Sequence, residues 1–302
     1  MIPTPRTVLV GVDFSESGER AQERALALAS GWGAEIVLHH VIQSSLWEDL
    51  RDDADDSDQP TPEQAQTRAL AALQPRAEVA GQLHGLRCRA QVSIGRAAHA
   101  LAAAVEACGA QLLVVGSHGE RSIRDAVLGS TAQKLTRLSP CPVLVIKRPL
   151  ESPYRTVLAP TDFSPASRAA LRLALSWLPG ATVHVAHAFE LPYDGMARFA
   201  GIDDEIMSGY HRRAAARLRV QMQAFVDHCR PVPGACVTLV VHGHAASFIG
   251  RWVRDVDADV VVIAARGKSE TERAFLGSVS LDAVQQAACD VLLVRGLAEQ
   301  AA

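Results

Sequence analysis

Short apolar runs alternate with longer amphipathic stretches along the whole chain. In the first half, runs that fit strands buried on both faces of a parallel sheet fall near 6–12, 34–42, 86–93, 111–116 and 142–147. Between them, helical spacing of apolar residues falls near 16–31, 64–83, 96–108 and 130–139. The second half has strand patterns near 155–160, 181–188, 235–241, 259–265 and 290–295. This alternation predicts the α/β class, with a doubly wound, five-stranded parallel sheet in each half.

The second half repeats short motifs of the first half at a nearly constant distance. The matching pairs are Asp13-Phe14-Ser15 with Asp162-Phe163-Ser164, Gly95-Arg96-Ala97-Ala98 with Gly243-His244-Ala245-Ala246, Gly119 and Gly129-Ser130 with Gly267 and Gly277-Ser278, and Cys141 with Cys289. The offset is 149 residues at the first pair and 148 at the others. A period this long indicates duplicated domains and not a solenoid. We therefore predict two homologous domains, 1–148 and 153–298.

One stretch of the first half, Val114–Thr131, has the composition of a strand, a loop and the start of a helix. Gly116 and Gly119 carry no Cβ, so backbone can come close to a ligand there. Gly129, Ser130 and Thr131 then begin a helical pattern, which places free N–H groups and the positive end of a helix dipole at one spot. Such a spot suits a phosphate. The alternative is an ordinary connection in which Ser130 or Thr131 caps the helix.

Asp13 follows the first strand, as Gly116 follows the fourth. In a five-stranded doubly wound sheet these strands are neighbours, and ligands bind in the crevice outside their carboxyl ends. A carboxylate at one end and a phosphate cradle at the other describe a mononucleotide site. Asp13 and Asp162 could instead cap the helices that follow them, as could Ser15 and Ser164, and both interpretations stay open.

Composition narrows the class of protein. The chain has 302 residues, enough for two full-sized cores, and 48% hydrophobic with 21% charged residues is typical of a globular protein. A net charge of -3 favours neither nucleic acid nor anionic membrane as a partner. No apolar run approaches the ~18 residues of a membrane span, and we expect no signal peptide. Six scattered cysteines without a CxxC pair are typical of reduced thiols, so we expect a cytoplasmic protein.

Other motifs in the sequence give little evidence of a catalytic or metal site. Gly267-Lys268-Ser269 is not a P-loop, because Val262 stands where that motif needs a glycine. The histidines of His39-His40 and His242-Gly243-His244 have no third ligand at a recognisable spacing, which favours structural or surface roles over metal binding. No Gly-x-Ser-x-Gly elbow is present. We therefore predict no catalytic residue and no metal ligand.

The spacing Gly116-x2-Gly119-x9-Gly129-Ser130, with Val10-Gly11-Val12-Asp13 upstream and Cys141-Pro142-Val143-Leu144-Val145 at the end, resembles the universal stress protein family. The resemblance covers nearly the whole chain, twice, and points to a tandem member of the ATP-binding type. It implies Rossmann-like domains of the adenine nucleotide alpha hydrolase kind, with ATP as ligand, alone or with Mg²⁺. The contacts it implies in the first half are Gly11, Val12, Asp13 and Val41 for the nucleoside, and Val115, Gly116, His118, Gly119, Gly129, Ser130 and Thr131 for the ribose and phosphates.

The second half departs from the family pattern. Ala264 stands at the position of Gly116, so a methyl group replaces bare backbone there, while Arg266 and Lys268 add positive charge. The contacts implied in this half are Pro160, Thr161, Asp162, Arg266, Gly267, Gly277, Ser278 and Val279. We expect a complete first site and a weakened or repurposed second one.

The sequence leaves three functions open. The favoured one is a regulatory protein of the stress response, in which adenine nucleotide changes conformation or partner binding. The alternatives are a slow ATPase or phosphotransferase, and an interaction module that binds no nucleotide.

The closing strands 143–146 and 291–294 would be sheet edges, which a protein must cover or pair. Single-domain family members commonly dimerise through this strand, so we expect the halves to pack with pseudo-two-fold symmetry; further homodimerisation stays open.

Overall fold

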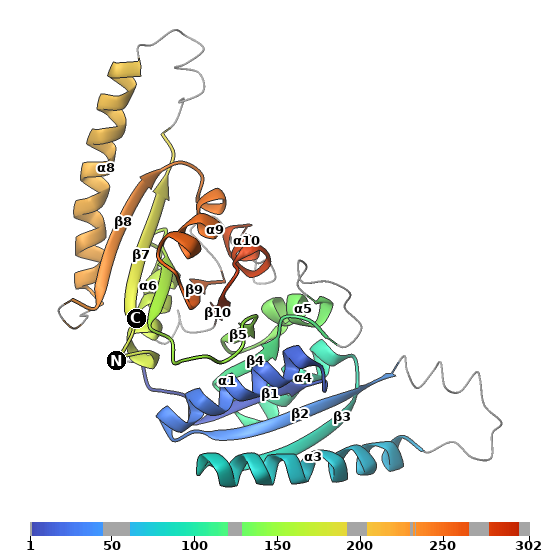
Figure 1. The fold of residues 1–302 in the computed structure, drawn as a ribbon. Helices are drawn as coiled ribbons and strands as arrows, with labels where there is room; N and C mark the ends of the chain where they lie inside the picture. Colours follow the sequence, from blue (N-terminus) through green and yellow to red (C-terminus); the bar gives the residue numbers. More distant parts are fainter. Residues whose placement is uncertain are drawn as a thin grey trace. The chain divides into compact units, whose positions relative to one another are not determined.

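A computed structural model describes residues 2–44, 61–119, 129–191, 204–229, 232, 234–265 and 278–295. The chain divides into two compact units (Figure 1). The first unit is Thr4–Pro153, and the second is Tyr154–Ala302 together with Met1–Pro3. None of the helices in these described segments combines the length and apolarity that a bilayer-spanning helix requires.

The first unit is built on a five-stranded parallel sheet. Its strands are β1 (Thr7–Val12), β2 (Glu35–Gln43), β3 (Cys88–Gly95), β4 (Leu112–Gly116) and β5 (Val143–Ile146), in the order β3-β2-β1-β4-β5. Val10 lies beside Leu38 of β2 and Val114 of β4, and all three are fully buried. The strand order reverses between β1 and β4, which is the position where doubly wound sheets bind ligands.

The helices that the structure describes in this unit cover the two faces of the sheet (Figure 1). They are α1 (Glu16–Trp32), α3 (Pro62–His84), α4 (Ala97–Cys108) and α5 (Ser130–Leu138). α1 and α3 contact each other, and so do α4 and α5, which gives one pair of helices on each face. α1, α3 and α4 each end at a glycine in the left-handed conformation, namely Gly33, Gly85 and Gly109. A residue without Cβ adopts that conformation at little cost, so glycine ends the helix there.

The second unit repeats this architecture. Its strands are β6 (Thr156–Pro160), β7 (Thr182–Phe189), β8 (Cys236–His242), β9 (Val260–Ala264) and β10 (Asp290–Val294), in the order β10-β9-β6-β7-β8. Its helices are α6 (Pro165–Trp177), α8 (Asp204–Asp227), α9 (Ala245–Asp255) and α10 (Ser278–Gln286). The reversal between β6 and β9 corresponds to the one between β1 and β4.

The predicted fold class, two tandem doubly wound parallel sheets, is confirmed. Each predicted strand begins and ends within two residues of the observed one. One difference concerns the first residues of the chain, which the sequence assigns to the first domain. The N–H of Ile2 donates to Ser176 Oγ at 3.2 Å, and the indole N–H of Trp177 donates to the carbonyl of Pro3 at 2.9 Å. These bonds attach residues 2 and 3 to α6 of the second unit.

Candidate functional site

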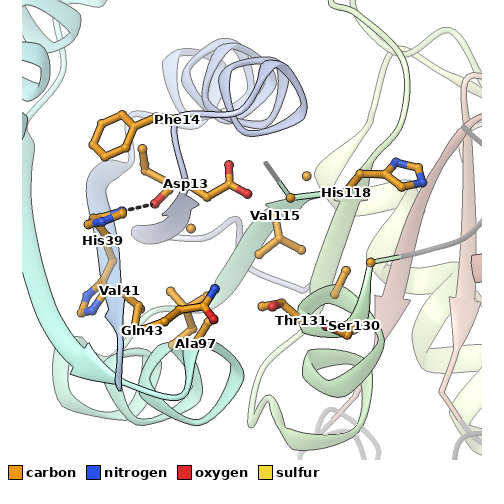
Figure 2. Close-up of a pocket in the computed structure, with 18 of the residues that line it drawn as sticks. Asp13, Phe14, His39, Val41, Gln43, Ala97, Val115, His118, Ser130 and Thr131 are labelled. Atoms are coloured by element: carbon orange, nitrogen blue, oxygen red, sulfur yellow. Dashed lines mark hydrogen bonds between the residues drawn. The ribbon is translucent and has the colours of Figure 1, made fainter. Parts of the chain in front are cut away.

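A cavity of about 730 Å³ lies at the carboxyl ends of β1, β2 and β4 in the first unit (Figure 2). Every first-half site residue that the sequence indicates lines it: Gly11, Val12, Asp13, Val41, Val115, Gly116, His118, Gly119, Gly129, Ser130 and Thr131. The lining also includes residues that the sequence did not single out as binding residues: Phe14, His39, His40, Ile42, Gln43, Ala97, Leu101, Ser117 and Ala132. Three strand ends and two helix starts thus converge on one space.

Asp13 presents one carboxylate oxygen to its own turn. Its Oδ1 accepts hydrogen bonds from the N–H of Ser15 at 3.1 Å and from the hydroxyl of Ser15 at 2.6 Å. Ser15 in turn caps α1 by accepting from the N–H of Gly18 at 3.1 Å. The helix cap therefore belongs to Ser15, and Asp13 fixes the capping residue. The other oxygen, Oδ2, lies on the side of Gly119, where a Cβ would stand 3.1 Å from it.

Phe14, which lies between Asp13 and Ser15 in the sequence, forms an aromatic rim of the cavity. Its φ of 59° is in the left-handed region, which a bulky residue rarely adopts. The side chain is 41% exposed, and its ring centroid lies 4.8 Å from that of His40. The His40 Nδ1–H donates to the carbonyl of Val12 at 2.7 Å, which holds that ring beside β1. The guanidinium of Arg76 lies 5.1 Å above the Phe14 ring, close enough for a cation–π contact.

Gly116 has a packing role beside the ligand approach that the sequence suggested. A Cβ on Gly116 would stand 2.6 Å from Ser17 Oγ and 2.7 Å from the backbone carbon and oxygen of Ser17. The missing side chain thus makes room for the first turn of α1, and not only for a ligand. Gly129 is also confined: its N–H donates to the carbonyl of Ser117 at 2.7 Å, and a Cβ would stand 3.1 Å from that oxygen. Glycine at both positions lets the ends of β4 and α5 lie close to other backbone.

The starts of α4 and α5 supply positive electrostatic potential. In the segments that the structure describes, no side chain caps either helix, and neither has an acidic residue in its first turn. Ala97 at the start of α4, and Ser130, Thr131 and Ala132 at the start of α5, line the cavity. Uncapped N–H groups and the dipoles of two helices make this end of the cavity suitable for an anion. Ser130 and Thr131 follow the cap position, Gly129, so the capping alternative does not apply to them.

His118 does not direct its ring into the cavity. Figure 2 shows the ring turned away from the space between Asp13 and Thr131. Its Nδ1 lies 2.9 Å from Ser117 Oγ, and its backbone N–H donates to Ser17 Oγ at 3.3 Å. A side-chain contact from His118 to a bound ligand therefore requires a change of rotamer. Among the described residues, no three His, Cys, Asp or Glu side chains are grouped to hold a metal ion.

His39 is a buried polar group in the cavity wall. It is 5% exposed, its Nε2 lies 2.8 Å from Ser93 Oγ, and its Nδ1 lies 3.4 Å from Gln91 Oε1. Burial lowers the pKa of His39 below its ordinary value of 6.5, and the nearby His40 lowers it further, although the bond to Gln91 opposes both. The imidazole is therefore held in its neutral form.

Acidification should destabilise the first unit through His39. The unfolded chain binds this proton near pH 6.5, whereas the folded chain resists it. The contribution to stability is thus complete above pH 6.5 and is lost as the pH falls toward the lower pKa of the folded state. We expect His39→Gln, which stays neutral, to flatten the dependence of the unfolding free energy on pH below 6.5, measured by urea denaturation. An unchanged slope would assign the acid sensitivity to other groups.

The second unit keeps the turn after its first strand. Phe163 has a φ of 63°, its ring centroid lies 4.3 Å from that of His187, and the His187 Nδ1–H donates to the carbonyl of Thr161 at 2.7 Å. Pro160 is the last residue of β6, and Asp162 accepts from the N–H of Ser164 at 3.0 Å. The predicted residues Arg266, Gly267 and Gly277 lie outside the described residues. Ser278 and Val279 begin α10.

The model of the universal stress protein family matches residues 4–147 and again 153–295. The chain belongs to the universal stress protein family. Two universal stress protein domains therefore stand in tandem, as the sequence predicted.

Curated universal stress proteins match this chain one domain at a time. A universal stress protein of Thermus aquaticus is 31% identical over 143 residues, which are 47% of this chain and 98% of the relative. The protein YxiE of Bacillus subtilis is 26% identical over 156 residues, 46% of this chain and 97% of the relative. Each of these relatives thus has the length of about half of this chain.

Solved structures match the whole chain. A universal stress protein from Archaeoglobus fulgidus aligns with a TM-score of 0.68 at 20% identity, over 96% of this chain and 98% of that one. A functionally unknown protein, PA1789 from Pseudomonas aeruginosa, aligns with a TM-score of 0.68 at 19% identity, over 96% and 92%. At this identity the likeness shows the tandem fold.

Proposed function

We propose that the first unit binds an adenine nucleotide, ATP alone or with Mg²⁺, and that occupancy of this site regulates conformation or partner binding in a stress response. The observation that carries the proposal is the polarity of the cavity. Asp13 and the uncapped start of α5 both line it, and Figure 2 shows Asp13 on one side of the space and Ser130 and Thr131 on the other. A nucleotide has hydroxyl and amino donors at one end and phosphates at the other, in the matching order.

The walls between these ends suit the nucleoside. Val41, Leu101 and Val115 supply apolar surface, and the volume is within the range of about 300–1,000 Å³ that is usual for small-molecule sites. Asp13 accepts hydrogen bonds only, so it selects the donors of a ribose or of an exocyclic amine. Phosphate oxygens at the starts of α4 and α5 would meet backbone N–H groups and two helix dipoles.

The site supports binding better than rapid turnover. Fast phosphoryl transfer needs a group that positions the attacking nucleophile. The ring of His118, the nearest candidate in the sequence motif, is turned away from the cavity, and one oxygen of Asp13 is held by Ser15. A protein that binds a nucleotide without hydrolysing it rapidly is suited to signal through the occupancy of its site.

Titration of the full chain with ATP tests this function. We expect one tight ATP per chain by calorimetry, and nucleotide released on denaturation of the purified protein. Adenosine should bind about tenfold or more weakly than ATP, because it lacks the anion that the helix starts attract. Absence of ATP binding, or two equal tight sites, would contradict the proposal.

A further inference from the structure

Gly18 occupies a confined position behind Asp13. It is the third residue of α1, and its N–H makes the capping bond to Ser15. A Cβ built on Gly18 would collide with Oδ1 of Asp13 and would lie 3.4 Å from Ser15 Oγ. The carboxylate of Asp13 can therefore occupy its observed position only because residue 18 has no side chain.

The second unit has a side chain at the same place. Ser167 corresponds to Gly18, since its N–H donates to Ser164 Oγ at 3.1 Å, the same capping bond. The hydroxyl of Ser164 donates to Ser167 Oγ at 3.3 Å, whereas the hydroxyl of Ser15 donates to Asp13. Thr161 Oγ1 lies 2.9 Å from Ser167 Oγ. Asp162 still accepts from the N–H of Ser164 at 3.0 Å, so the second unit keeps this bond. Its capping hydroxyl, however, bonds within a cluster of three buried hydroxyls and not to the carboxylate.

We propose that Gly18 is a positioning residue that lets the first unit present Asp13 to a nucleotide, and that Ser167 weakens this arrangement in the second unit by engaging the hydroxyl of Ser164. The inference rests on the proposed function, because it assumes that the cavity binds adenine nucleotide. It assigns the difference in nucleotide binding between the two units to a residue outside the glycine motif that follows β4. It also explains why the second unit should bind nucleotide more weakly without invoking the methyl group of Ala264.

Two effects of Gly18 act on the ligand through Asp13. The two bonds from Ser15 hold Oδ1 in place, so the carboxylate is ordered before a ligand arrives and no ordering free energy is lost on binding. Oδ2 is thereby directed toward Gly119 and the cavity. A side chain at residue 18 would force Oδ1 away and turn Oδ2 with it. Loss of one charge-assisted hydrogen bond corresponds to roughly 10- to 100-fold in affinity.

The test compares alanine at two glycines of the same helix in the full chain. Gly18→Ala adds the colliding methyl group, and Gly18→Ser reproduces the residue of the second unit. Gly31→Ala is the matched control, because nothing lies within 4 Å of a Cβ at Gly31. We expect ATP affinity, measured by calorimetry, to fall roughly 10- to 100-fold for both Gly18 variants and to stay unchanged for Gly31→Ala.

A double-mutant cycle separates positioning from a general distortion of α1. In an Asp13→Ala background, Gly18→Ala should cause no further loss of ATP affinity, since the group through which it acts is absent. Thermal unfolding of each variant reports whether the unit stays folded. Wild-type affinity in Gly18→Ser, or an undiminished loss in the Asp13→Ala background, would overturn the inference. Failure of the unmodified protein to bind ATP would instead overturn the proposed function.

Discussion

Replacing Gly116 with alanine is expected to lower the free energy of unfolding of the first unit by about 3 kcal/mol. The new Cβ would stand 2.6–2.7 Å from Ser17, and two of the three atoms that it meets belong to the backbone of α1. Backbone cannot rotate away as a side chain can, so the end of β4 or the first turn of α1 must move. Urea denaturation, followed by a signal of the first unit, measures the loss.

Two further variants define the origin of this loss. Gly31→Ala, on the exposed end of the same helix, should be neutral or slightly stabilising. Ser17→Ala removes only the hydroxyl, so it should restore a minor part of the stability of Gly116→Ala. If Ser17→Ala fully restored the unfolding free energy of Gly116→Ala, contact with the backbone of Ser17 would not be the cause of the loss.

The same geometry changes the interpretation of Ala264. This residue is buried at the end of β9, a strand that packs against α6, and the residue corresponding to Ser17 is Ala166. The sequence suggested that a methyl group at 264 obstructs a ligand. The position of Gly116 in the first unit points to a second role for this methyl group, in the packing of β9 against α6. Ala264→Gly is therefore not expected to create a nucleotide site.

Gly119→Val should reduce ATP affinity roughly 100-fold and leave stability almost unchanged. A Cβ there would stand 3.1 Å from Asp13 Oδ2, and the two methyl groups of valine would extend into the space between Asp13 and the start of α5. The cavity would have less room for the ligand, and the ligand would lose a hydrogen bond to the carboxylate. Gly119 is exposed, so its replacement disturbs little packing.

Calorimetry on Gly119→Val, with Gly119→Ala as a smaller step, gives the measurement. Alanine should cause a smaller loss, because the neighbouring carboxylate can yield by a few tenths of an ångström. Equal ATP affinity in the unmodified protein and in Gly119→Val would place the nucleotide outside this cavity.

The fold could be predicted from the sequence because its determinants are local. Strands such as β1 and β4 are buried on both faces, so they appear as continuous apolar runs, and the helices between them carry the helical spacing. Glycine at 33, 85 and 109 marks helix ends for a conformational reason that needs no tertiary contact. The repeat then extended the assignment to the second half.

The candidate site could be predicted only as far as it depends on strand ends. The carboxyl ends of β1 and β4 meet because the sheet order reverses between them, and this follows from fold class. The direction of side chains does not follow from it. Phe14 lies beside His40 because of a positive φ, and the ring of His118 turns away from the cavity. Gly18 matters through a carboxylate five positions earlier in the chain, which no periodicity indicates.

The buried hydroxyl of Ser167 has a consequence for the shape of a dose–response curve. Sigmoidal binding requires at least two coupled sites for the same ligand. If Ser167 leaves nucleotide binding to the first unit, as proposed, a monomeric chain has a single site, so its occupancy rises hyperbolically with nucleotide concentration and its Hill coefficient is one. With the proposed nucleotide site, such a protein would respond gradually to nucleotide concentration, without a threshold.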